Sequence, residues 1–287
     1  MTSAIEHLGR IVNQPQNWDF SGAGCLYAGV DIGTYKTIAV VVDEKGFPRA
    51  ASMRKAAVVQ SGLIVDYIGA LKLVREIMEE IRSRSPLPID RGATSFPPRT
   101  ESANIKTTRY ILEGAGLEVL RVLDEPSAAK QVLDLNDGAI VDVGGGTTGV
   151  AIVKDGEIVH TNDEATGGVH FSLVLAGSLN ISYEEAEAYK ADRDHRRDII
   201  PIVRPVIDKI ATIVEQDIRP YENVDTVWMV GGTCALDGMA DIVGDHLQKE
   251  TLRPEAPQMI TPFGIALSCL EAGGSGSGER IADHAIH

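Results

Sequence analysis

Two stretches of the sequence place an aspartate directly before a glycine turn at the end of an apolar run. Residues 140–149 read IVDVGGGTTG, and a shorter copy, DIGT, covers residues 31–34. Successive backbone N–H groups of a glycine-rich turn can point together at phosphate oxygens, because glycine has no side chain to block the approach. The aspartate before each turn repels phosphate but is a good ligand for Mg²⁺. The two stretches therefore indicate binding of a metal-bound polyphosphate.

The same glycines also match a dinucleotide fingerprint, with the pattern G-x-G-x-x-G at Gly144, Gly146 and Gly149 and an acid at Asp163. That fingerprint requires a helix to begin directly after the third glycine. Here residues 150–153 continue as a β-rich run, residues 154–157 carry the D-G turn signal, and 158–161 return as a second strand. The glycines therefore lie on a strand-to-strand turn, which argues against a dinucleotide fold.

The elements around the two turns form a repeat. After the first turn, residues 37–42, 43–46 and 47–52 are expected to form a strand, a turn and a return strand, as after the second turn. Residues 65–82 then place five apolar side chains at helical spacing, namely Ile68, Leu71, Val74, Met78 and Ile81. The equivalent later helix is expected at 169–180. The chain is thus read as two α/β domains whose glycine hairpins face each other across a cleft.

The later parts of the two halves also correspond. In the first half we expect a strand at 93–96, a helix at 101–114, a strand at 117–123 and a helix from Pro126. In the second half the matching elements are expected at 226–230, 237–249, 258–260 and 262–270. The predicted boundaries are an N-terminal extension 1–25, a first domain 26–137, a second domain 138–271 and a flexible tail 272–287. The last helix of the second domain is expected to pack back on the first.

Composition restricts the partners. The 287 residues are 44% hydrophobic and 24% charged, which is typical of a globular protein, and the net charge of −14 disfavours nucleic acid and anionic membranes as partners. No run of ~18 apolar residues could span a bilayer, and the first residues lack the apolar core of a secretion signal. The three cysteines have no zinc-ligand spacing. We therefore expect a cytoplasmic protein.

The motifs resemble those of the actin-like ATPase superfamily, which includes the heat-shock chaperone nucleotide domains, MreB and FtsA. Residues 31–34 resemble its first phosphate motif, 142–148 its second, and 230–233 its adenosine motif; 123–129 and 261–266 resemble its two connecting helices. The resemblance implies two actin-like (ribonuclease H-like) domains with mixed five-stranded sheets flanked by helices and a cleft between them. Because the insertions of the relatives are missing, the peripheral subdomains are expected to be reduced.

Within the superfamily, residues 166–177 and 183–187 resemble most the EutJ family of ethanolamine-utilisation proteins. This resemblance implies ATP and Mg²⁺ as cofactors and a chaperone-like role in a bacterial microcompartment, assisting assembly or enzyme reactivation. Its protein partners would be an enzyme or the shell, and a slow Mg-dependent ATPase activity is left open. Two alternatives remain: a non-hydrolysing nucleotide-binding scaffold, and a filament-forming ATPase like MreB or FtsA.

The resemblance also implies site residues. Asp31 and Asp142 would hold Mg²⁺, and Glu125, with Asp142, would serve catalysis by orienting the attacking water. The nucleotide contacts would come from Gly33, Thr34, Tyr35, Gly144, Gly145, Gly146, Thr147, Glu187, Lys190, Gly231, Gly232 and Thr233.

Each of these roles has a simpler alternative. The aspartates could merely initiate turns, Glu125 could be a first-turn acid favoured by its helix dipole, and the Gly-Gly loop could be ordinary turn chemistry. Lys36 could replace a lysine that the chaperones use, but it is expected to face solvent.

Overall fold

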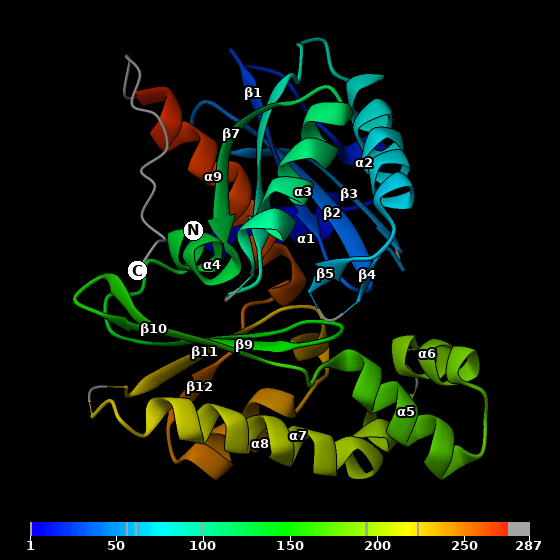
Figure 1. The fold of residues 1–287 in the computed structure, drawn as a ribbon, viewed down its shortest axis with the longest axis vertical. Helices are drawn as coiled ribbons and strands as arrows, with labels where there is room; N and C mark the ends of the chain where they lie inside the picture. Colours follow the sequence, from blue (N-terminus) through cyan, green and yellow to red (C-terminus); the bar gives the residue numbers. More distant parts are fainter. Residues whose placement is uncertain are drawn as a thin grey trace.

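The computed structural model contains two five-stranded mixed sheets flanked by helices, which confirms the predicted fold class (Figure 1). It describes residues 2–55, 57–60, 62–98, 100–192, 195–222 and 224–274. The strand orders, β3-β2-β1-β6-β7 and β10-β9-β8-β11-β12, are equivalent. In each sheet the three strands of the hairpin unit pair antiparallel, and the two later strands are added in parallel. The predicted repeat is therefore present in the topology.

The first sheet carries helices on both faces. Its strands are β1 Leu26–Ile32, β2 Lys36–Asp43, β3 Pro48–Lys55, β6 Arg91–Phe96 and β7 Glu118–Asp124. The helices α2 (Tyr67–Arg82) and α3 (Ser102–Gly114) cover one face. A small hairpin of β4 (Val59–Gln60) and β5 (Leu63–Ile64) lies beside α3.

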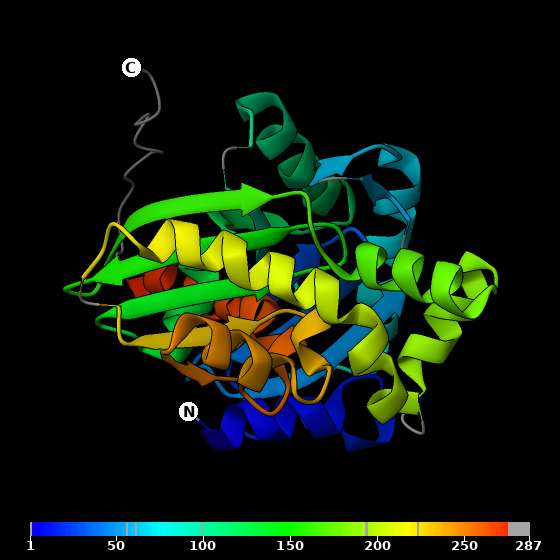
Figure 2. The same cartoon turned by 90° about the horizontal axis from the view of Figure 1, so that it is seen from below.

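The second sheet repeats this plan with shorter parallel strands. Its strands are β8 Gly138–Val143, β9 Thr148–Lys154, β10 Glu157–Glu164, β11 Thr226–Val230 and β12 Glu250–Leu252. Its helices are α5 Gly168–Leu179, α6 Tyr183–Ala191, α7 Arg196–Ile218 and α8 Met239–Leu247. Figure 2 shows α7 and α8 across the outer side of this sheet, and α5 and α6 toward one end of it. These helices bury the core that faces away from the first half.

Two helices, α4 (Glu125–Leu133) and α9 (Ile260–Gly274), pack on each other where the halves meet. The buried cluster around them combines Val40 of β2, Ile140 of β8 and Phe263 of α9, and so it belongs to both halves. α9 contacts the strands of the first sheet although it follows the second in sequence. Residues 275–287, which contain most of the predicted tail, lie outside the described residues.

The structure adds one detail to the helix predicted at 65–82 and corrects one predicted strand. Ile68 is 71% exposed, because it lies six residues before Val74 and, at about 100° per residue, on another side of α2. The strand expected at 258–260 is instead a short 3-10 helix, Pro257–Met259, and the fifth strand is β12. Here β12 pairs with β11 through only Thr226, Val227 and Trp228.

The N-terminal extension forms a helix that the sequence reading did not predict. In α1 (Thr2–Ile11), Leu8 and Ile11 are fully buried, and Figure 2 shows the helix lying beside the first sheet. It contacts β3 and the 3-10 helix Pro257–Met259, and a second 3-10 helix, Pro15–Asn17, follows it. The extension is therefore part of the core of this fold.

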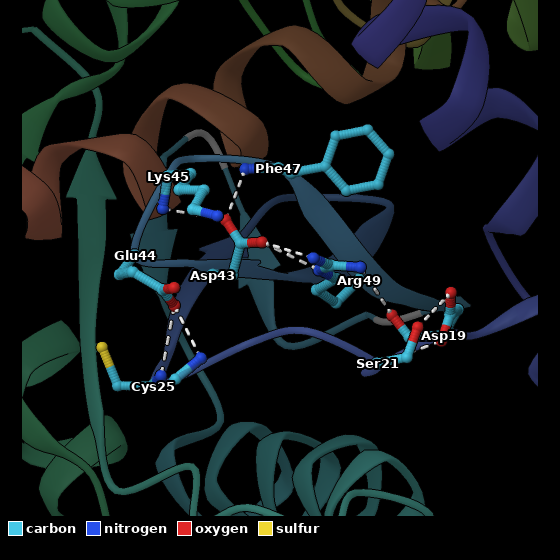
Figure 3. A network of polar contacts seen from close by, with 9 residues as sticks. Asp19, Ser21, Cys25, Asp43, Glu44, Lys45, Phe47 and Arg49 are labelled. Carbon is cyan, nitrogen blue, oxygen red and sulfur yellow. Dashed lines mark hydrogen bonds and ion pairs between the residues drawn. The ribbon is translucent and has the colours of Figure 1, made fainter.

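A buried aspartate holds the predicted turn between β2 and β3 (Figure 3). Asp43 Oδ1 accepts hydrogen bonds from the backbone N–H groups of Lys45 and Phe47, both at 2.9 Å. Its Oδ2 accepts two from the Arg49 guanidinium, at 2.7 and 2.9 Å. The two oxygens of Asp43 thus tie the turn and the Arg49 side chain of β3 together, and charge-assisted hydrogen bonds of this kind are stronger than neutral ones.

None of the helices in the described part of the chain combines the length and apolar character that a membrane-spanning helix requires.

Candidate functional site

A cavity of about 300 Å³ lies between the two halves, and both glycine hairpins open into it. Every residue that the sequence nominated lines it. These residues are Asp31, Gly33, Thr34, Tyr35, Glu125, Asp142, Gly144, Gly145, Gly146, Thr147, Glu187, Lys190, Gly231, Gly232 and Thr233. They come from the two hairpins, from the first turn of α4, from α6 and from the loop that follows β11. The fold thus gathers in one place residues that are up to about 200 positions apart in the chain.

The two hairpin turns are closed by the same hydrogen bond. Gly33 N–H donates to the Lys36 carbonyl and Gly144 N–H to the Thr147 carbonyl, each at 3.0 Å. Each turn therefore has a two-residue tip, Thr34-Tyr35 in one half and Gly145-Gly146 in the other. A Cβ atom added to Gly145 would lie 2.8 Å from the Tyr35 Cβ, so the tips touch across the cavity. Glycine is required in the second tip because the first tip occupies that space.

The second turn is held from behind by its carbonyl groups. The Gly144 carbonyl accepts hydrogen bonds from Gly168 N–H at 3.0 Å and from the Thr233 hydroxyl at 2.7 Å. The Gly145 carbonyl accepts one from Val169 N–H at 2.8 Å. Over the described residues, no protein acceptor is found for the N–H groups of Gly145, Gly146 and Thr147. The turn thus offers backbone donors to an anion, which is the arrangement of an anion-binding nest.

Three partly buried carboxyl groups line the cavity close to one another. Asp31 lies near the end of β1, Asp142 at the equivalent position of β8, and Glu125 is the first residue of α4. Burial and the neighbouring Asp142 raise the pKa of Asp31 to about 7, against an opposing effect of Lys36. Burial, Asp31 and Asp142 raise the pKa of Glu125 well above its usual value, and burial also raises that of Asp142. Their negative charges are poorly compensated by the protein, which is typical of functional sites.

Lys36 lies inside the cleft, contrary to the expectation that it would face solvent. Its Nζ is close to Gly232, where an added Cβ would lie 3.0 Å away. Burial and the nearby Lys190 lower its pKa, while Asp31 opposes this shift. Lys36 immediately follows the first tip and begins β2, so the hairpin itself directs it inward. In the sequence, the inward direction of Lys36 was indicated only by its position two residues after Thr34.

Glu187 and Lys190 lie one turn apart on α6 and bind each other. Lys190 Nζ is 2.7 Å from Glu187 Oε1, and it also donates to the Ser172 hydroxyl at 2.6 Å and the Gly168 carbonyl at 2.9 Å. These bonds use all three ammonium protons. Burial alone would raise the pKa of Glu187, but hydrogen bonds from Lys190 and Ser172 lower it overall. As the cavity stands, Lys190 holds Glu187 and the start of α5, so a direct contact with nucleotide stays a prediction.

Comparison with known proteins identifies the family. The ethanolamine utilization protein EutJ of Escherichia coli K12 is 42% identical over 246 residues, which cover 85% of this chain and 86% of the relative. The chain belongs to the EutJ family. The crystal structure of EutJ from Carboxydothermus hydrogenoformans is 41% identical, covers 93% of this chain and 98% of its own, and superimposes with a TM-score of 0.87. The predicted membership is therefore confirmed.

More distant proteins share similarity with this chain in sequence or in fold. The family model of the type IV pilus assembly protein PilM matches residues 109–256. The structure of MreB 5 of Spiroplasma citri bound to AMPPNP has a TM-score of 0.65 at 16% identity, covering 84% of this chain and 95% of its own. At that identity the likeness shows the fold alone.

The carboxylates of this EutJ-family cleft can be tested against Mg²⁺. Over the described residues, no cluster of three or more side chains has the geometry of direct metal ligands. Mg²⁺ usually keeps several waters and binds one or two carboxylates plus substrate phosphates. Asp31 and Asp142 line the cavity from equivalent strands, their charges are compensated only in part by Lys36, and they fit such a hydrated ion. The site residues are therefore compatible with the group that the family implies.

Without nucleotide and Mg²⁺, the protein is expected to lose stability as the pH rises from about 5 to 7. The folded-state pKa of Asp31 lies above its unfolded value, so the native state binds the extra proton and its stabilising effect disappears as pH approaches the folded pKa. One proton corresponds to about 1.4 kcal/mol per pH unit, and because Asp31 is half deprotonated at its folded pKa the loss over this window is roughly 2 kcal/mol. Urea unfolding at a series of pH values measures it.

The matched comparison for this pH effect is Asp31→Asn, which removes the titrating group and should flatten the profile by about that amount. The same change at Asp225, whose side chain is 90% exposed, should leave the slope of the wild type. Equal slopes in the wild type and Asp31→Asn would show that Asp31 is ionised normally.

Proposed function

We propose that the cleft binds ATP with Mg²⁺ and hydrolyses it slowly. The observation that carries this proposal is the meeting of two hairpin turns, the second with unused backbone donors, and three poorly compensated carboxyl groups in one cavity. The backbone N–H donors can bind phosphate oxygens, and the carboxylates can bind the cation that accompanies the phosphates. Mg²⁺ would supply charge neutralisation of the phosphates.

The residues divide into three tasks under this proposal. Asp31 and Asp142 hold the hydrated cation, and the tips of the two hairpins bind phosphate oxygens through backbone N–H groups. Lys36, directed into the cavity by β2, adds a positive charge beside them. The turn Gly231–Gly232 allows close approach of the nucleoside, because a side chain there would displace Asp142 or Lys36.

Glu125 is proposed to orient the attacking water. It lines the cavity, it is the first residue of α4, and Asp31 and Asp142 are the charged groups with the strongest effect on its pKa. Positioning of the nucleophile is what this residue can contribute, since phosphoryl transfer depends mainly on placement and charge stabilisation.

We further propose that the protein serves ethanolamine utilisation as a chaperone-like partner of a microcompartment enzyme or of the shell. Support comes from EutJ relatives that are 40–42% identical over 85% of the chain. The described residues contain no separate peptide-binding domain beyond the two halves, so a partner would bind the surface of the halves themselves.

Saturating Mg²⁺-ATP is expected to raise the melting temperature of the wild type, because a ligand that binds only the folded state stabilises it. At a ligand concentration about a hundred times Kd, the gain is about 2.7 kcal/mol. Asp142→Asn should abolish the rise. In the absence of ligand this variant should melt no lower than the wild type, since it removes a buried charge from a repulsive cluster. Differential scanning calorimetry measures both effects.

Asp225→Asn, the same change at an exposed position, provides the control and should keep the full response. A wild type that shows no heat of binding and no shift with millimolar Mg²⁺-ATP would refute nucleotide binding and favour the scaffold alternative. A shift without phosphate release would favour a non-hydrolysing scaffold that still binds nucleotide.

A further inference from the structure

The duplication of the halves pairs the two connecting helices as well as the two aspartates. The first turn of α4 contains Glu125-Pro126, and the first turn of α9 contains Thr261-Pro262. Asp31 and Asp142 occupy equivalent positions at the ends of β1 and β8. Each half therefore combines one aspartate with the beginning of one connecting helix.

The second of these pairs is a hydrogen bond. The Thr261 hydroxyl donates to Asp142 Oδ2 at 2.7 Å, and the side chain is buried in the lining of the cavity. The other oxygen, Oδ1, lies against the backbone of Gly231, where no Cβ would fit. The Asp142 carboxylate is thus held from both sides. Its counterpart in the first half is the acid–acid pair of Asp31 and Glu125.

Thr261 is carried by a helix that follows the second sheet in sequence but packs mainly on the first half. Beyond its first turn, α9 packs on β1, β2, β6 and β7 of the first sheet and on α4. Asp142, in contrast, ends a central strand of the second sheet. The hydrogen bond therefore links a carboxylate of one half to a helix whose position is determined by the other half.

We propose that Thr261 is a positioning residue, which fixes the Asp142 carboxylate toward the hydrated cation and makes that orientation depend on how the halves are closed. This inference rests on the proposed binding of Mg²⁺ and ATP. Partners that orient a metal-binding group contribute substantially to metal affinity even though they do not touch the metal. The equivalent positions at the start of the two helices therefore have different tasks under this proposal. Glu125 of α4 orients water, whereas the Thr261 hydroxyl of α9 holds the Asp142 carboxylate.

The test is a Mg²⁺ titration of the melting temperature at a fixed, saturating ATP concentration. Thr261→Val keeps the shape of the side chain and removes the donor, and it should raise the Mg²⁺ concentration for half-maximal stabilisation by about tenfold or more. Thr261→Ser restores the hydroxyl and should return this concentration to within about threefold of the wild type. Thr212→Val makes the same change on α7, where the hydroxyl is exposed and binds the Asp208 carbonyl, and should have no effect.

A second readout separates positioning from folding. Circular dichroism at each condition checks that the variants are folded, and direct binding of Mn²⁺ in the presence of ATP, followed by electron paramagnetic resonance, should weaken in parallel with the Mg²⁺ response. If Thr261→Val does not fold, the Thr261→Ala and Thr261→Ser pair provides the comparison.

Two results would overturn the positioning role while leaving nucleotide binding intact: a Thr261→Val variant with the Mg²⁺ response of the wild type, or a Thr261→Ser variant as impaired as Thr261→Val. A wild type without any response to Mg²⁺-ATP would refute the proposed function, and this inference with it.

Discussion

Glu125→Gln is expected to lower the rate of ATP hydrolysis by about a hundredfold or more while leaving the affinity for Mg²⁺-ATP within about threefold of the wild type. Glutamine keeps the size of the side chain and its place at the start of α4, but it cannot carry the negative charge that orients the attacking water. Phosphate release in single-turnover experiments measures the rate. The ligand-induced rise in melting temperature measures the binding.

The alternative role of Glu125 is that of an acid placed favourably in a helix dipole. That role would change stability by less than about 1 kcal/mol and leave the rate unchanged. Glu101→Gln is the matched control, because Glu101 precedes α3 as an exposed acid without a side-chain cap. Hydrolysis by Glu125→Gln at the rate of Glu101→Gln would contradict the assignment of Glu125 to the chemistry.

Gly264→Ala is expected to reduce the free energy of unfolding by about 3 kcal/mol or more. An added Cβ would lie within 2.5 Å of the Ala128 carbonyl carbon on α4, so the two helices would have to separate. On its other side α9 is just as close to the first sheet, because a Cβ at Gly29 of β1 would meet the Ala266 Cα at 2.7 Å. With no room on either side, the added methyl group overpacks a core shared by both halves.

Gly177→Ala gives the matched control for this change. Gly177 lies within α5 with nothing within 4 Å of an added Cβ, and alanine there should stabilise the protein by about 0.5–1 kcal/mol. Urea unfolding of both variants measures the difference. If Gly264→Ala lowers the free energy of unfolding by less than about 1 kcal/mol, α4 and α9 can move apart easily. Nucleotide binding, which uses Glu125 at the start of α4 and Thr261 at the start of α9, should then survive as well.

Local signals in the sequence were sufficient for most of the elements. The hairpins were predictable because a D-G turn signal or a glycine-rich turn between two β-rich runs indicates that these runs pair with each other. All the residues involved lie within about ten positions of the turn. The two closing bonds, from Gly33 to Lys36 and from Gly144 to Thr147, follow from those short turns. The candidate residues could be nominated because each belongs to such a local motif, and the repeat indicated that the motifs would meet.

Non-local pairing was where the sequence reading was wrong. The strand expected at 258–260 is β12, Glu250–Leu252, because a parallel edge strand is defined by the partner it joins, and three residues carry too little periodic signal. Helix α1 was missed because its apolar residues Leu8 and Ile11 gain their burial only from β3 and from the segment near Pro257. Ile68 shows the converse, an apolar residue in a correct helix that faces solvent.

By itself the sequence determined which residue types this protein brings to a phosphate and metal site, and on which turns they lie, because glycine turns and strand ends depend on neighbouring residues. Only the tertiary structure decided how those groups are oriented and what they already bind. Lys36 turns into the cleft, Lys190 uses its protons on Glu187, Ser172 and Gly168, and Thr261 holds Asp142 from the opposite half. These outcomes depend on burial and on partners that are distant in the chain. Burial and such partners determine where a charge is stable, and no local sequence pattern encodes them.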